Sequence, residues 1–170
     1  MYHIKLFMEK TVEENLQNVD HSALRTNQAF IIGLLVLGFI LNQPWLVALV
    51  MLVMLAGTVL RRPGFGFIYT LALKPLGWVK PDVLRDNPEP HRFAQGFGGV
   101  VLVGALLALI LDAPGLGWAL TWLVVVLAAL NLFAGFCVGC AVYYWLNRLS
   151  VPGFVKSPPE GTFPGMRPRS

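Results

Sequence analysis

Four apolar runs constrain this sequence more than any other feature. We expect them to form membrane-spanning helices at about residues 24–42, 44–61, 93–111 and 116–145, because a spanning helix needs about 20 mainly apolar residues. The third run fits this length, whereas the second is short and the fourth is long. Charged residues make up 13% of the chain, against about 25% in a typical soluble domain. A soluble four-helix bundle is excluded, because almost no polar face would remain to meet water.

Two short turns that contain proline join these runs in pairs. Asn42-Gln43-Pro44 separates the first run from the second, and Asp112-Ala113-Pro114-Gly115 separates the third from the fourth. Turns this short place consecutive helices side by side and antiparallel. We therefore expect an all-α integral membrane protein, a four-helix bundle built from two transmembrane hairpins.

The basic residues predict the orientation of these helices. All thirteen Lys and Arg fall before or at the start of the first span, from the end of the second span to the third, or after the fourth: Lys5, Lys10, Arg25, Arg61, Arg62, Lys74, Lys80, Arg85, Arg92, Arg148, Lys156, Arg167 and Arg169. The two hairpin turns contain none. The positive-inside rule then places both termini and the central connector on the cytoplasmic side of a cell membrane. A net charge of +4 could indicate binding to nucleic acid, but the positive-inside bias already accounts for it. We therefore expect the lipid bilayer as a partner and no nucleic acid.

The segments outside the four runs differ in composition. Residues 65–77 are apolar but too short to cross a bilayer, and we expect an interfacial helix there. The stretch from Lys80 to Pro90 is polar and contains three prolines, which indicates an ordered loop. The first 18 residues show no signal-peptide pattern and are expected to be a cytoplasmic segment before a transmembrane domain at 19–149. Residues 150–170 form a Pro-rich cytoplasmic tail, expected to be extended or disordered.

A short pattern occurs at the start of both hairpins. Both the first and the third run open with R-x-x-Q-x-F, as Arg25 with Gln28 and Arg92 with Gln95. A histidine, His21 or His91, precedes each copy. Two parallel hairpins related by an axis along the membrane normal would bring these residues to one end of the bundle. They would either close that end through ion pairs with nearby carboxylates or bind an anion between the repeats.

Both cysteines, Cys137 and Cys140, lie in one Cys-x-x-Cys pair near the end of the fourth run. In a continuous helix they would lie near its C-terminal end, where the dipole disfavours a thiolate, and they would be inert packing residues. Gly135 and Gly139 could instead break the helix and place Cys140 at the N-terminus of a second helix, near His91 or Arg92. The alternatives stay open. No second Cys-x-x-Cys or His pair accompanies the cysteines, so we expect no metal and no cofactor.

Three segments carry a family resemblance. "VDHSALRTNQAF", "PEPHRFAQGFGG" and "LNLFAGFCVGC" together resemble a family of small bacterial and archaeal integral membrane proteins called domain of unknown function 4395, over about residues 19–149. The resemblance implies thioredoxin-like or rhodanese-like proteins as partners. It therefore implies thiol or sulfur handling, with Cys137 and Cys140 as the reactive pair.

Three functions agree with these observations. The first is a membrane dithiol that exchanges electrons or sulfur with a cytoplasmic thioredoxin-like or rhodanese-like partner. In this function Cys137 and Cys140 react while His91 and Arg92 favour the thiolate. The second is a small transporter of a sulfur-containing anion, with Arg25 and Arg92 as selectivity charges and Gln28 and Gln95 beside them. The third is a non-catalytic subunit of a larger membrane complex.

Overall fold

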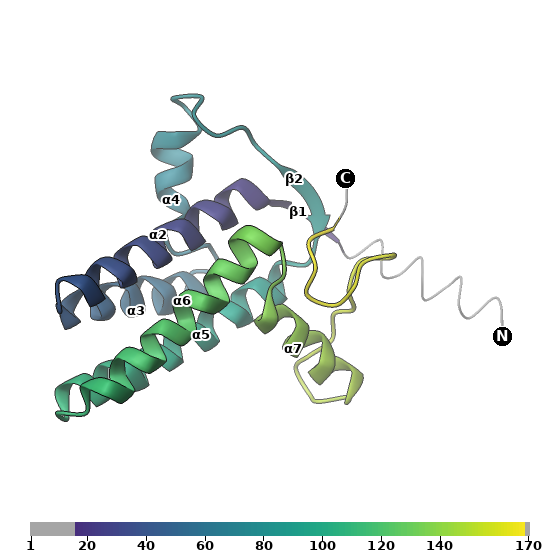
Figure 1. Cartoon of the computed structure of the whole chain (residues 1–170). Helices are drawn as coiled ribbons and strands as arrows, with labels where there is room; N and C mark the ends of the chain where they lie inside the picture. Colours follow the sequence, from purple (N-terminus) through teal and green to yellow (C-terminus); the bar gives the residue numbers. More distant parts are fainter. Residues whose placement is uncertain (1–15, 169–170) are drawn as a thin grey trace, which may run out of the picture.

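The computed structural model describes residues 16–168 and is predominantly helical (Figure 1). Its elements, in chain order, are β1 (Gln17–Asp20), α2 (His21–Ile40), α3 (Pro44–Val59), α4 (Gly66–Ile68), η1 (Tyr69–Leu73), β2 (Val83–Asp86), α5 (Pro88–Ile110), α6 (Pro114–Ala134) and α7 (Val138–Arg148). The short element η1 is a π-helical continuation of α4. Most of the expected N-terminal segment, 1–18, lies outside the described residues.

Three helices in the described part of the chain, α2, α5 and α6, are long and apolar enough to cross a membrane by length and composition. Helix α3 is also apolar but shorter, with 16 residues. Helices α2, α3, α5 and α6 begin at residues 21, 44, 88 and 114, whereas the expected spans begin at 24, 44, 93 and 116. Helices α3 and α6 each begin with a proline, whose fixed φ angle suits the first turn and whose missing N–H costs nothing there.

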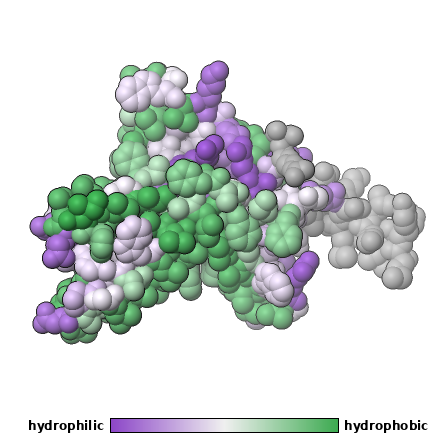
Figure 2. All heavy atoms as spheres, in the orientation of Figure 1, coloured by the Kyte–Doolittle hydropathy of each residue, from purple (hydrophilic) through white to green (hydrophobic). Residues whose placement is uncertain are grey.

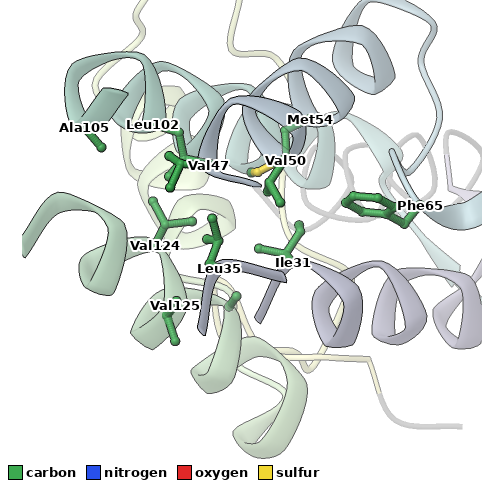
Figure 3. Packing of buried hydrophobic residues seen from close by; sticks show 11 residues of the cluster. Ile31, Leu35, Val47, Val50, Met54, Phe65, Leu102, Ala105, Val124 and Val125 are labelled. Carbon is green, nitrogen blue, oxygen red and sulfur yellow. The ribbon is translucent and has the colours of Figure 1, made fainter. Parts of the chain in front are cut away.

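Helices α2, α3, α5 and α6 pack around one apolar core. Helix α2 contacts α3 and α6, and α5 contacts the same two helices. Figure 3 shows side chains from all four helices pointing toward one another. Those labelled are Ile31 and Leu35 from α2, Val47, Val50 and Met54 from α3, Leu102 and Ala105 from α5, Val124 and Val125 from α6, and Phe65. Burial of such side chains is the main favourable term in folding.

The outer faces of these helices are apolar as well. Large exposed side chains include Val59, Val100, Ile110 and Leu123. Figure 2 shows hydrophobic residues covering the long helices, while hydrophilic residues gather at the hairpin turns and at the opposite end near the strands. Exposed apolar surface of this extent is typical of contact with lipid or with other membrane helices.

The two hairpins turn in the same way. Asn42 and Asp112 each follow the last turn of a helix with a positive φ, 49° and 57°, a conformation that Asn and Asp tolerate better than most residues. The next N–H then donates back into the helix, from Gln43 to Gly38 O and from Ala113 to Ala108 O. The same ending follows α3 and α7, at Arg61 and Ser150, so the likeness of the two turns reflects a common C-terminal cap.

The fourth run is not one helix, which corrects the span expected at 116–145. Helix α6 ends at Ala134, and Gly135 adopts a left-handed conformation with φ of 64°. Such a residue is a common helix terminator, and glycine adopts this conformation without the steric cost that a Cβ imposes. The chain then turns into α7, which packs against α5.

The connector also differs from expectation. The interfacial helix expected at 65–77 is helical only from 66 to 73, and turns follow it. The loop expected from Lys80 to Pro90 instead contains strand β2 and the first residues of α5, which begins at Pro88. The described part of the tail, 150–168, contains no helix or strand, but its Met166 forms an isolated β-bridge with Phe136.

Candidate functional site

A two-stranded antiparallel sheet brings the starts of α2 and α5 together. Strand β1 directly precedes α2 and pairs with β2, with Gln17 opposite Asp86 and Asp20 opposite Val83. The carboxylate of Asp20 caps α2 by accepting the N–H of Ser22 at 3.0 Å, and it also accepts the N–H of Asp82 at 3.2 Å. Both helix starts, and the histidine near each, are therefore held beside the sheet.

Asp86 lies between these two histidines. Its Oδ2 is 2.9 Å from Nε2 of His91 and 3.3 Å from Nε2 of His21, and its Oδ1 accepts the N–H of Asn87 at 2.8 Å. The Asp86 and His21 side chains are buried, and that of His91 is partly buried. One carboxylate thus orients the His91 ring through a hydrogen bond and contacts His21 as well, and the two imidazole rings meet edge to face.

These contacts perturb the pKa of Asp86. Burial acts to raise that pKa, but the hydrogen bonds from His91 and from the N–H of Asn87, together with the close approach of His21, outweigh burial and hold the pKa well below its ordinary value. Asp86 therefore stays ionised. In a neutral His91 ring whose Nε2–H donates to this carboxylate, Nδ1 carries the lone pair.

Nδ1 of His91 points at the cysteine pair. It lies 3.5 Å from Sγ of Cys140. The contact depends on a close approach of α7 to α5 at Gly139, where an added Cβ would lie 2.5 Å from Cβ of Ala94. Glycine within the Cys-x-x-Cys segment thus lets the cysteines reach the histidine.

The cysteines themselves open α7. Cys137 is the N-cap residue of that helix, and its Sγ accepts the N–H of Cys140 at 3.2 Å. The two cysteines form a disulfide, with Cα atoms 5.2 Å apart. A sulfur at a helix N-terminus experiences the positive end of the dipole, which favours a thiolate when the pair is reduced. The break expected as an alternative is therefore present, with Cys137 rather than Cys140 at the cap.

The C-terminal tail packs on this cap. The N–H of Cys137 donates to Gly165 O at 2.7 Å, and the N–H of Arg167 donates to Gly135 O at 2.9 Å. The guanidinium of Arg167 pairs with Asp82, next to β2. The tail therefore connects the cysteine segment to the strand that carries Asp86.

A cavity of about 660 Å³ opens at this site. Both cysteines, both histidines and Asp86 line it, and so do Arg25, Gln28 and Arg167. A smaller apolar cavity of about 120 Å³ lies between α2, α5 and α6 and also reaches Cys137 and His91. Both cysteines are buried, at 6% and 3% exposed, and the larger cavity is the one that both of them line.

The structure brings some of the predicted site residues together and separates others. Cys137, Cys140, His91, Arg25 and Gln28 line the same cavity. Arg92 does not line it. Within residues 16–168 its ion-pair partner is Glu89 at 4.0 Å.

Gln95 also lies away from the larger cavity, and its contacts are structural. Its Oε1 accepts the N–H of Gly64 at 3.2 Å, and its Nε2 donates to Met54 O at 2.9 Å. The amide therefore ties α5 to α3 and to the loop that follows α3.

His21 and Asp86 belong to the site, although the sequence had assigned neither of them a catalytic or binding role. The signal for His21 was its position before the first R-x-x-Q copy, matching His91 before the second. Asp86 had no comparable signal, because the four-residue strand that places it is too short to show alternation.

Two sets of three side chains have donor atoms close enough to share a metal ion. His91, Cys137 and Cys140 form one set, and His21, Asp86 and His91 form the other, with all donor atoms of a set within 4.8 Å of one another. Both sets use His91 and lie at the wall of the larger cavity.

Comparison with known proteins identifies one family. The family described as "Domain of unknown function (DUF4395)" matches residues 19–148, nearly the segment over which the sequence resembles it. No curated protein and no solved structure matches the chain.

Proposed function

We propose that this chain, which belongs to the domain of unknown function 4395 family, is a membrane component that exchanges electrons through the Cys137–Cys140 dithiol. The observation that carries the proposal is the line of contacts from Asp86 through His91 to Cys140, beside Cys137 at a helix N-terminus. A packing role for the cysteines does not require an oriented imidazole.

The two cysteines have different parts in this function. Cys137 is the attacking residue, because its sulfur accepts a backbone N–H at the start of α7 and so favours the thiolate. Cys140 is the resolving residue, because its sulfur faces the free Nδ1 of His91, which takes up the thiol proton. Asp86 is a positioning residue that fixes the tautomer of His91.

The exchange proceeds in two steps with a partner disulfide. First, the Cys137 thiolate bonds to one partner sulfur, the partner S–S bond breaks, and the second partner sulfur leaves as a thiolate. Second, Cys140 gives its proton to His91 and attacks Sγ of Cys137, which releases the first partner sulfur as a thiolate. The partner gains two electrons and this chain loses two. The reverse sequence oxidises a partner dithiol.

A thioredoxin-like cytoplasmic protein is the partner class that this chemistry fits best. We propose that helices α2, α3, α5 and α6 cross the cell membrane as a four-helix bundle, with both termini and the dithiol on the cytoplasmic side. The distribution of Lys and Arg supports this orientation.

Trapping the mixed disulfide tests the proposal. With reduced protein and an oxidised thioredoxin-like probe, the Cys140→Ala variant is expected to accumulate a mixed disulfide, because the resolving sulfur is absent. The Cys137→Ala variant, the matched control, is expected to accumulate at least tenfold less. Non-reducing electrophoresis of alkylated samples measures both.

Other outcomes of this experiment favour other functions. Trapping by Cys137→Ala instead would exchange the two roles. No trapping with either variant would end the exchange proposal, leaving a subunit of a larger complex or a sulfur-anion transporter. The specific observation for transport is that Arg25 and Gln28 line the larger cavity, and loss of sulfur-anion uptake in Arg25→Ala would then support it.

A further inference from the structure

The reduced form of the cysteine site has the composition of a zinc site. Sγ of Cys137, Sγ of Cys140 and Nδ1 of His91 lie within 4.8 Å of one another. Two thiolates and one imidazole suit Zn²⁺, which binds sulfur and nitrogen ligands in a tetrahedral arrangement. Reduction breaks the S–S bond and makes both sulfurs available as thiolate ligands.

The surroundings of His91 match those of a metal-binding histidine. Such a histidine usually donates its second N–H to a carboxylate, which fixes the tautomer and orients the ring. Here Nε2 of His91 lies 2.9 Å from Oδ2 of Asp86, and His21 holds the same oxygen from the other side at 3.3 Å. The carboxylate and the second histidine are therefore already placed to support a ligand.

The second set of donors, His21, Asp86 and His91, fits an ion less well. Its donor atoms already contact one another through Oδ2 of Asp86, so an ion there would have to replace those contacts. An ion bound by His91, Cys137 and Cys140 leaves those contacts intact, because it binds to Nδ1 of His91, the ring nitrogen that faces the sulfurs.

We propose that the reduced protein binds one Zn²⁺ through Cys137, Cys140 and His91, with the fourth position open to the larger cavity. Binding replaces the protons of the two thiols, so two protons leave as two Zn–S bonds form. The disulfide form has no thiolate to offer and does not bind. The inference uses the same cysteines as the proposed function but does not require exchange to occur.

Metal binding to the full chain in detergent tests the proposal. Protein reduced with a phosphine is titrated with Zn²⁺ against a coloured chelator, and with Co²⁺ to observe thiolate-to-metal charge-transfer absorption. We expect one ion per reduced chain and none in the disulfide form. Because both forms have the wild-type sequence, this comparison does not depend on any variant folding.

Variants then assign the ligands. The Cys137→Ser and Cys140→Ser double variant is expected to lose the charge-transfer absorption, and His91→Ala is expected to weaken Zn²⁺ binding. Asp86→Asn is expected to weaken it by about 10–100-fold, the usual effect of losing a carboxylate behind a ligand. The matched control is Glu89→Gln, which removes a carboxylate near His91 that belongs to neither donor set and is expected to leave affinity unchanged.

Three results would overturn the inference. These are no Zn²⁺ bound by the reduced wild type, equal binding by the disulfide form, or undiminished binding without both cysteines. Its failure is distinguishable from that of the exchange proposal. Mixed-disulfide trapping without Zn²⁺ binding refutes only the metal site, and Zn²⁺ binding without trapping refutes only the exchange.

Discussion

At the scale of single residues, the two R-x-x-Q patterns place their residues in different roles. His21 and His91 converge on one carboxylate, as the repeat would suggest, but the glutamines do not correspond. Gln28 lines the cavity and makes no hydrogen bond within the described chain, whereas Gln95 bonds to Gly64 and Met54. A shared motif therefore does not assign a shared function.

This difference leads to a stability prediction for the glutamines. Gln95→Ala is expected to lower the free energy of unfolding by about 2 kcal/mol, because it leaves the N–H of Gly64 and the carbonyl of Met54 without this partner. Gln28→Ala, the matched control, is expected to change it by less than about 0.5 kcal/mol. Unfolding by denaturant in detergent micelles measures both. Equal effects of the two variants would contradict the structural role of Gln95.

At the scale of elements, the site depends on where α6 stops and how closely α7 approaches α5. Gly135 ends the first helix in a left-handed conformation, and Gly139 lets the second helix contact Ala94. The same segment as one continuous helix would place the cysteines at a C-terminal end. Gly135 and Gly139 therefore place the two cysteines at the start of a helix beside His91, instead of at the end of one continuous helix.

The close approach at Gly139 can be tested by adding a methyl group and then removing its neighbour. Gly139→Ala places a Cβ 2.5 Å from that of Ala94, so α7 is expected to shift away from α5 and the Cys140–His91 contact to lengthen. Disulfide exchange is expected to slow by about tenfold, part of the 10²-fold or more that a positioned acid–base group supplies. Stopped-flow release of a coloured thiolate from a small aromatic disulfide measures the rate.

A second substitution supplies the control for that experiment. Ala94→Gly in the Gly139→Ala background removes the clashing methyl group and is expected to restore most of the exchange rate, although glycine within α5 costs about 1 kcal/mol of stability. Failure of this double variant to recover, with the fold intact by circular dichroism, would show that the contact does not set the rate.

The long helices and their hairpins follow from apolar runs and proline positions, because membrane helices must be long, apolar and internally hydrogen-bonded. The break after Ala134 was left open, because glycines occur both inside membrane helices and at their ends. Strands β1 and β2 were missed because each has four residues and their pairing is remote in sequence. Since that pairing positions Asp86 and His21, the cysteines and His91 were predictable while their supporting residues were not.

At the scale of the molecule, polar residues are concentrated at two ends and apolar residues cover the surface between them (Figure 2). One end consists of the hairpin turns, and the other contains the strands, the tail and the cysteine site. Lys and Arg are absent from the hairpin turns. This distribution agrees with the proposed orientation, in which the end with the site faces the cytoplasm.

This arrangement predicts which positions an impermeant reagent reaches. In a chain carrying Cys137→Ala and Cys140→Ala, the single replacements Gln43→Cys and Ala113→Cys lie in the two hairpin turns. Both are expected to react with a membrane-impermeant maleimide in intact spheroplasts. Leu149→Cys, an exposed position at the end of α7, is expected to react only after permeabilisation, because positive-inside bias holds that end in the cytoplasm. A membrane-permeant maleimide that labels all three variants is the control for thiol accessibility.

Labelling of Leu149→Cys in intact spheroplasts would show that the orientation is the reverse of the proposed one. If the reagent labelled only one of the two turns, the two helices joined by the unlabelled turn would not both cross the membrane.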